Sequence, residues 1–242
     1  MVLDTLSLQS EFENIVVRVA TAQDIHFATL ITDEMEASAK ARGTGIAKRT
    51  PEYVAQKMSE GRAVVAHLKD GTWVGFCYIE AWGHGQFVAN SGLIVAPLFR
   101  KSGVATQIKG RIFNLSREMY PSAKIFGLTT GLAVMRMNSE LGYVPVTYSE
   151  LTNDDEFWSN CRSCVNYDIL QSKERKNCLC TGMLYDPARV PVKEIASVNK
   201  SSSADKSSSV NKSSSAKNLD LAPNLSAKSS PSKNLFSRFF RR

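Results

Sequence analysis

The residues best suited to chemistry lie in one short stretch that joins an apolar segment to a helix. The stretch runs from Gly92 to Ala105 and contains Arg100, Lys101 and Gly103. Small residues let a backbone approach a ligand closely, and the amides that open a helix point unpaired N–H groups toward an anion. With two cations beside it, the stretch predicts a cradle for a pyrophosphate. A tight strand-to-helix turn is the alternative, and it would need only one glycine.

A reaction at this place also needs a group that accepts a proton. Glu80 ends a predicted strand, His84 lies in the following loop, and His67 alternates with apolar neighbours in an earlier strand. Glu80 is our first candidate for a base that acts through water, with a solvated strand-end carboxylate as the alternative. His67 is more typical of a structural position. For an acidic substrate, Arg136 and Arg18 are candidate cationic partners, and an ordinary surface position is the alternative for both.

Four of the five cysteines form a second candidate site. They are spaced as Cys161-x-x-Cys164 and Cys178-x-Cys180. A short helix would put the first pair on one face, and a strand would put the second pair on one side. Two converging pairs predict a structural zinc site with four thiolate ligands. The alternative is a set of buried or loose thiols, and Cys77 is expected in the core.

The elements that must position these residues mix hairpins with crossovers. Strand patterns cover residues 15–20, 63–68, 73–80, 87–95, 124–129 and 143–148, and helical spacing covers 25–40, 51–60, 104–119 and 132–141. We expect Asp24 to cap the first of these helices. The order predicts an α+β (mixed α/β) fold, with a mixed, largely antiparallel sheet of six to seven strands flanked by helices.

Within this frame, Arg100-x-x-Gly103-x-Ala105 after a strand that ends Ile94-Val95 resembles motif A of the GCN5-related N-acetyltransferases (GNAT). The resemblance implies the GNAT fold and an N-acyltransferase that uses acetyl-CoA. It implies that the coenzyme lies on the following residues: Ile94, Val95, Arg100, Lys101, Ser102, Gly103, Val104 and Ala105. It also implies a backbone N–H near Val95 as oxyanion donor, and a gap beside residues 126–129.

One position departs from the family pattern. Many members carry a tyrosine four residues before the glycine that corresponds to Gly142, where it protonates the departing thiolate. This sequence has Asn138 there. An amide cannot protonate a thiolate, so another group or solvent does so, or the step needs no dedicated acid.

A narrower resemblance begins at Lys124. The run 125–130 with Thr129 and Thr130, followed by Tyr143 and residues 145–151, is similar to the acyltransferase domain of N-acetylglutamate synthases. It implies the α-amine of glutamate as acceptor, in arginine biosynthesis, with Thr129, Thr130 and Arg136 as substrate-binding candidates. We expect the protein to lack the amino-acid-kinase-like domain of many such synthases, so feedback control through it is expected to be missing or built differently.

Charge separates the body of the chain from its end. The net charge of +7 comes from residues 199–242, where nine basic residues face two acidic ones, so the body is balanced and not expected to bind nucleic acid. We expect an N-terminal extension (1–14), a GNAT core (15–150), a cysteine-containing extension (151–198) and a disordered Lys/Ser-rich tail (199–242). The sequence lacks a secretory signal or a membrane-spanning run, and its cysteines suit a reducing compartment, so we expect a cytoplasmic protein that can form a homodimer.

Three alternatives stay open at this point. The chain can be a non-catalytic GNAT-like module that binds CoA or a partner. It can be an acetyltransferase for a different amine or for a protein acceptor, and its donor can be acetyl-CoA or a larger acyl-CoA such as succinyl-CoA. Nucleic-acid binding through the tail is the third class, and it predicts salt-sensitive binding that is lost on truncation at Val198.

Overall fold

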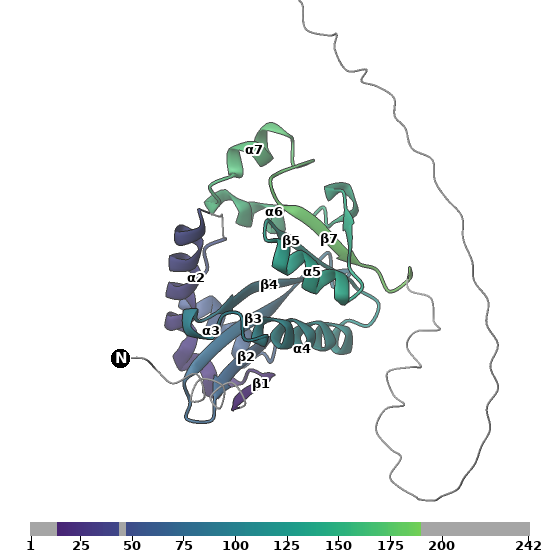
Figure 1. The fold of residues 1–242 in the computed structure, drawn as a ribbon. Helices are drawn as coiled ribbons and strands as arrows, with labels where there is room; N and C mark the ends of the chain where they lie inside the picture. Colours follow the sequence, from purple (N-terminus) through teal and green to yellow (C-terminus); the bar gives the residue numbers. More distant parts are fainter. Residues whose placement is uncertain (1–13, 44–46, 190–242) are drawn as a thin grey trace, which may run out of the picture. The chain divides into compact units, whose positions relative to one another are not determined.

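The computed structural model describes residues 14–43 and 47–189 (Figure 1). The predicted tail and all but the last residue of the predicted N-terminal extension lie outside the described residues. The predicted α+β fold is confirmed: a single mixed sheet carries helices on both faces.

The sheet has seven strands in the order β1-β2-β3-β4-β5-β7-β6. Their bounds are β1 Ile15–Val19, β2 Ala63–Leu68, β3 Trp73–Trp82, β4 Phe87–Val95, β5 Lys124–Thr129, β6 Val144–Val146 and β7 Thr181–Tyr185. All neighbouring pairs are antiparallel except β4 and β5, which run parallel. The segment after residue 150 thus returns to the sheet and places β7 between β5 and β6.

Helices divide the two faces of the sheet between them. The α-helices are α2 Ala28–Arg42, α3 Pro51–Ser59, α4 Val104–Met119, α5 Leu132–Glu140, α6 Asp155–Ser159 and α7 Tyr167–Ser172, and the 3-10 helices are η1 Ala22–Phe27, η2 Pro97–Phe99, η3 Tyr148–Glu150 and η4 Asn160–Ser163. On one face, α2 and α3 cover β2 and β3, while α6 and α7 cover β5 and β7; α4 and α5 lie on the other face (Figure 1). A strip of the first face is left between these two helical groups.

The sheet opens beside that strip. β4 and β5 pair over only three residues each, Phe87–Ala89 with Lys124–Phe126. Beyond Ala89, β4 continues beside β3, whereas β5 continues beside β7. The two strands therefore diverge, and their facing edges have no partner strand past this point. This is the gap that the sequence predicted beside residues 126–129.

A β-bulge in β4 lies just after the point of divergence. Tyr78 pairs with Ser91 and Phe76 with Ile94, so two residues of β4 stand opposite one residue of β3. Gly92 takes a φ of +67°, which a residue with a side chain rarely adopts. The bulge bends β4 away from β5, and the tight packing of Tyr78 against Gly92 leaves no room for a Cβ.

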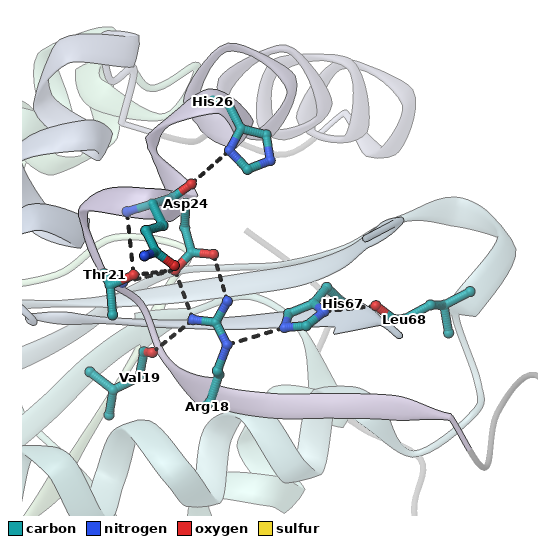
Figure 2. A network of polar contacts seen from close by, with 8 residues as sticks. Arg18, Val19, Thr21, Asp24, His26, His67 and Leu68 are labelled. Atoms are coloured by element: carbon teal, nitrogen blue, oxygen red, sulfur yellow. Dashed lines mark hydrogen bonds and ion pairs between the residues drawn. The ribbon is translucent and has the colours of Figure 1, made fainter. Parts of the chain in front are cut away.

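A polar network of Arg18, Asp24 and His67 joins β1, η1 and β2 near the start of the described chain (Figure 2). Arg18 donates to both carboxylate oxygens of Asp24, at 2.7 and 2.8 Å, and its Nε donates to His67 Nε2 at 3.1 Å. Since Nε2 accepts, the ring proton lies on Nδ1, which donates it to the carbonyl of Leu68 at 2.7 Å. His67 is therefore structural, as predicted.

The predicted helix start at this network is wrong in detail. Thr21, not Asp24, is the N-cap, and it caps the 3-10 helix η1 that precedes α2. Asp24 is the third residue of that helix, where its carboxylate closes a capping box with the backbone of Thr21 at 2.8 Å. The prediction differs from the structure because the buried Asp24 carboxylate also pairs with Arg18, a contact that the local sequence pattern does not indicate.

Candidate active site

A long groove lies on the α4 and α5 side of the gap. Its volume is about 900 Å³. Seven of the eight predicted coenzyme-binding residues line it: Ile94, Val95, Arg100, Lys101, Gly103, Val104 and Ala105. Ser102 does not line the groove, because its hydroxyl turns inward and donates to the carbonyl of Phe99 at 2.7 Å.

The loop at the end of this groove has the backbone of an anion cradle. Lys101 and Gly103 both have positive φ, +67° and +84°, and Gly103 is the N-cap of α4. Left-handed residues between ordinary ones turn successive N–H groups to the same side, and the first amides of α4 add their unpaired N–H groups. A Cβ built on Gly103 meets no atom within 4 Å, so the space over the loop is open.

Arg100 is engaged in holding this loop. Its guanidinium donates to Glu34 Oε1 at 2.7 Å and to Ser38 Oγ at 2.6 Å, both on α2, and its Nε donates to the carbonyl of Val95 at 3.1 Å. Arg100 therefore ties the groove to α2 and to the end of β4. The sequence did not indicate this ion pair. Because Arg100 is engaged in it, Lys101 and the backbone N–H groups are the less encumbered groups of the loop for binding an anion.

Val95 faces the gap with its backbone. The amide of Ala96 donates to the carbonyl of Val74 on β3 at 2.9 Å. Because successive residues of an antiparallel strand alternate in direction, the N–H of Val95 points away from β3 and toward the gap. This is the orientation that an oxyanion or pantetheine donor on β4 requires.

A second cavity, of about 280 Å³, lies on the opposite face of the sheet, in the strip between the two helical groups. Arg49, Tyr78 and Glu80 line one side of it, and Cys161, Cys164 and Cys180 line another. The cavity and the groove share five lining residues, namely Leu93, Leu128, Thr129, Val134 and Cys180. The two spaces thus meet at the gap between β4 and β5.

Glu80 sits in this cavity in a buried ion pair. Its Oε1 accepts from the hydroxyl of Tyr53 at 2.7 Å and from Arg49 at 3.1 Å, while Arg49 Nε donates to the Tyr78 hydroxyl at 2.8 Å. Glu80 is only 4% exposed. Burial, with the Glu80 charge next, raises the pKa of both tyrosines, so both stay protonated. Within the described part of the chain, no hydrogen bond is made to the other carboxylate oxygen, Oε2.

The other candidates for a base lie elsewhere. His84 lines a separate depression beside Tyr120 and Lys124, at the start of β4. His67 and Arg18 belong to the network of Figure 2. Of the predicted substrate-binding residues, Thr129 lines both the groove and the cavity, whereas Thr130 and Arg136 line the groove alone.

Asn138 occupies a closed position behind β5. It is 1% exposed, its amide nitrogen contacts Met183 Sδ at 3.8 Å, and its Oδ1 is buried without a hydrogen-bond partner among the described residues. It lines neither the groove nor the cavity. Nothing in this geometry gives Asn138 access to a leaving group.

The four cysteines gather around one place, although not as the sequence predicted. Cys161 lies in η4 and Cys164 follows it, and both Cys178 and Cys180 precede β7 instead of lying on it. All four line one small cavity of about 30 Å³. Burial, and then the neighbouring thiols, raise the pKa of Cys161 to about 11 and that of Cys180 to about 12.

These thiols do not form a ready-made metal centre. Within residues 14–43 and 47–189, no three side chains of His, Cys, Asp or Glu stand in positions that hold a metal ion. The predicted zinc site stays a prediction.

The partners of Glu80 and Arg100 were missed by sequence reasoning. Tyr78 and Glu80 are two apart on β3, which places them on one face of the sheet, and that signal was available. The contacts of Arg49 with Glu80 and of Glu34 with Arg100 span 31 and 66 residues, and no local pattern indicates them.

Comparison with known proteins gives a fold. No family model and no curated protein sequence matches the chain. Among solved structures, it is similar to N-acetylglutamate synthase from Neisseria gonorrhoeae in complex with coenzyme A and N-acetyl-glutamate (TM-score 0.50, 16% identity, 71% of this chain and 35% of that one). It is also similar to Rv2747 from Mycobacterium tuberculosis in complex with CoA (TM-score 0.50, 19% identity, 71% and 98%).

The chain spans about a third of the Neisseria synthase. With the divergent β4 and β5 and the loop before α4, these likenesses show the fold: it is that of the GCN5-related N-acetyltransferases. Among the helices of the described residues, none is long and apolar enough to cross a membrane.

Proposed function

We propose that this protein is an acyl-CoA-dependent N-acyltransferase that acts on the amine of a small molecule. The observation that carries the proposal is the meeting of two spaces at the gap between β4 and β5. One space ends in an anion cradle, and the other holds a buried carboxylate. A thioester in the groove and an amine in the cavity would meet there, in the arrangement that an acyl transfer needs.

The donor would bind with its pyrophosphate on the amides of residues 101–105 and its pantetheine arm along Ile94 and Val95. The loop supplies several N–H groups and the positive end of α4. The edge of β4 offers the Val95 N–H, which lies where it can donate to the thioester oxygen as negative charge develops. Acetyl-CoA is the leading donor, and a larger acyl-CoA is the alternative.

In the reaction, the neutral amine attacks the thioester carbonyl carbon and a tetrahedral intermediate forms. Glu80, through its Oε2 and a bridging water, takes the proton that the amine loses. The C–S bond then breaks, the amide is formed, and coenzyme A leaves as a thiolate that takes a proton from solvent. Arg49 and Tyr53 hold the carboxylate through Oε1 and leave Oε2 for this task.

Glutamate is the leading acceptor. Its support is the N-acetyl-glutamate bound to the similar Neisseria enzyme and the resemblance around Thr129 and Thr130. A dicarboxylate needs cations, and Arg49 in the cavity and Arg136 in the groove are the candidate partners. On the same grounds, we propose a role in arginine biosynthesis. A different amine acceptor and a non-catalytic CoA-binding module are the alternatives.

The deciding experiment measures coenzyme A release from acetyl-CoA and succinyl-CoA with a panel of amino acids and polyamines. We expect turnover that depends on an amine, with glutamate the best acceptor. If another amine is acylated faster, glutamate is wrong and the acyltransferase stands. If acetyl-CoA binds and no amine is acylated, the protein is a CoA-binding module.

The cradle is tested by a matched pair of substitutions, Gly103→Asp and Gly103→Asn. Both side chains tolerate a positive φ, and both enter the open space over the loop. Asp alone adds a negative charge where the pyrophosphate would lie. We expect the Asp variant to bind acetyl-CoA at least about tenfold more weakly than the Asn variant, measured by calorimetry. Equal affinities of the two variants for acetyl-CoA would show that the pyrophosphate does not bind at this loop.

The base is tested by Glu80→Gln. The amide keeps an acceptor for the Tyr53 hydroxyl but cannot take a proton, so kcat is expected to fall by about tenfold to a hundredfold, with the acetyl-CoA affinity unchanged. Tyr53→Phe is the control, because it removes the hydroxyl that donates to Oε1 and leaves the carboxylate of Glu80 in place. A pH–rate profile in which Glu80→Gln keeps the acidic limb of the wild type would rule Glu80 out as the base.

A further inference from the structure

The four-cysteine cluster stands in the wall of the proposed acceptor cavity. Cys161, Cys164 and Cys180 line that cavity, and together with Cys178 they surround the small cavity behind it. That inner space, of about 30 Å³, is comparable to the volume of a single water molecule. All four cysteines are free thiols, and all are partly exposed.

The backbone around the cluster is arranged to present the sulfurs. The amide of Asn166 donates to Cys164 Sγ at 3.4 Å, and the carbonyl of the same residue accepts from Cys178 Sγ at 3.7 Å. Tyr148 donates to the carbonyl of Cys180 at 2.8 Å. One residue thus joins the two halves of the cluster, and a buried tyrosine fixes the last cysteine.

The segment that carries these cysteines has little regular structure of its own. Its helices α6, η4 and α7 have five, four and six residues. Glu174 and Arg175, between α7 and Cys178, both have positive φ. Short segments of this kind are commonly held by a disulfide or a metal ion. A few buried side chains, among them Trp158 and Leu170, form the only apolar cluster that this segment makes in the described part of the chain.

We propose that Cys161, Cys164, Cys178 and Cys180 bind one Zn²⁺ ion, which fastens η4 to the start of β7 and fixes the wall of the acceptor cavity. Four sulfurs around a space of this size are the ligand set of a tetrahedral structural zinc site. Each thiol releases its proton to solvent as its sulfur becomes a ligand, so no oxidant or reductant is required.

A divalent cation explains why four thiols share one space. If the four cysteines served only to fill space, no backbone N–H would need to point at a sulfur, as that of Asn166 does at Cys164. No three His, Cys, Asp or Glu side chains of the described residues are already positioned to hold a metal ion, so the proposal requires the sulfurs to move inward when the ion binds. A pair of disulfides is the competing cross-link, and the test separates the two.

The test starts with the full chain, purified from cells grown with zinc, with its metal content and free thiols measured. We expect about one zinc per chain. After removal of zinc by a chelator, Co²⁺ should restore a site with the visible absorption of tetrahedral cobalt thiolate. Cys161→Ser and Cys180→Ser should each lose the metal. Cys77→Ser is the matched control, because Cys77 is buried on the other face of the sheet, beside Ser91, and should keep it.

Three results would overturn the proposal. They are a zinc-replete protein that holds no metal, metal that survives in both Cys161→Ser and Cys180→Ser, and disulfides among the four residues in protein purified without reductant. Limited proteolysis provides a readout apart from activity: cleavage between residues 165 and 177 should become faster by about tenfold when zinc is removed.

The effect on the acceptor cavity rests on the proposed function, whereas metal binding does not. If the enzyme proposal holds, Cys161→Ser should raise the KM for the acceptor by about tenfold and leave the KM for the acyl-CoA within twofold. If no amine is acylated while zinc is present in stoichiometric amount, the function is wrong and the zinc site stands. An acceptor KM that does not change on zinc loss would refute the role in the wall.

Discussion

Replacing Gly92 with alanine is expected to destabilise the protein by about 3 to 5 kcal/mol and to disturb the cleft where β4 leaves β5. A Cβ on Gly92 would lie 2.4 Å from Cε1 of Tyr78 and 2.8 Å from Cε of Met35. Met35 is flexible, but the Tyr78 ring is buried and held by Arg49. The positive φ of +67° adds strain of about 1 to 2 kcal/mol for a residue with a side chain.

Gly43→Ala separates these two costs. Gly43 has a φ of +59°, close to that of Gly92, and a Cβ there meets nothing within 4 Å. It is the C-cap of α2 and, unlike Gly92, lines neither the groove nor the cavity. We expect this variant to be destabilised by the backbone strain alone, by about 1 to 2 kcal/mol. The free energies of unfolding in urea measure both changes, and equal losses in the two variants would show that Tyr78 can move aside.

The bulge also explains why Tyr78 matters to the chemistry. The Tyr78 ring packs against the turn of β4, and its hydroxyl accepts from Arg49, which pairs with Glu80. A displaced ring therefore moves the guanidinium and, through it, the carboxylate. At temperatures where the Gly92→Ala variant is folded, we therefore expect its activity to be lower than that of the wild type.

Much of this site could be predicted because its signals are local. The loop before α4 depends on Gly103 and on amides that follow it directly, and β4 and α4 have the bounds that their sequence patterns predict. The contacts that organise the site join distant parts of the chain. Glu34 meets Arg100 across 66 residues, and Arg49 meets Glu80 across 31. Their pairing follows from how α2 and α3 pack on the sheet.

The cysteines illustrate the same limit. Their spacing indicated a shared site, and the four do line one cavity. The helix and the strand that were to present them are wrong, because α6 ends at Ser159 and β7 begins only at Thr181. Short irregular segments take their form from long-range contacts such as that of Tyr148 with Cys180, so their spacing predicts a neighbourhood more reliably than a conformation.

Lys109→Met is expected to stabilise the protein at pH 7 by about 1 to 3 kcal/mol. Lys109 lies on α4 beneath β4 and is 3% exposed. Its ammonium has weak compensation, a 3.4 Å contact with Asn90 Oδ1 and the ring of Tyr143 at 5.1 Å. Burial lowers its pKa from 10.5 to about 8. Asn90 Oδ1 still accepts from the Tyr143 hydroxyl at 3.0 Å in the variant, so no polar atom there loses its last partner.

The pH dependence gives this prediction its sign. Below pH 8, Lys109 is protonated in the folded and unfolded chains, and the folded state bears the full cost of the buried charge. Between pH 8 and 10.5 the unfolded chain holds the extra proton, so the stability of the wild type rises with pH through this interval. The methionine variant lacks this rise, and its advantage should shrink from pH 7 to pH 9.5.

Urea unfolding of both proteins at several pH values measures this difference in the free energy of unfolding. Lys40→Met is the control, because Lys40 is exposed on α2 and its loss should change stability by less than about 0.5 kcal/mol. If Lys109→Met is instead less stable than the wild type at pH 7, the contacts of the buried ammonium outweigh the cost of burying its charge. Lys109 would then help to fix Asn90, the first residue of β4 beyond its pairing with β5.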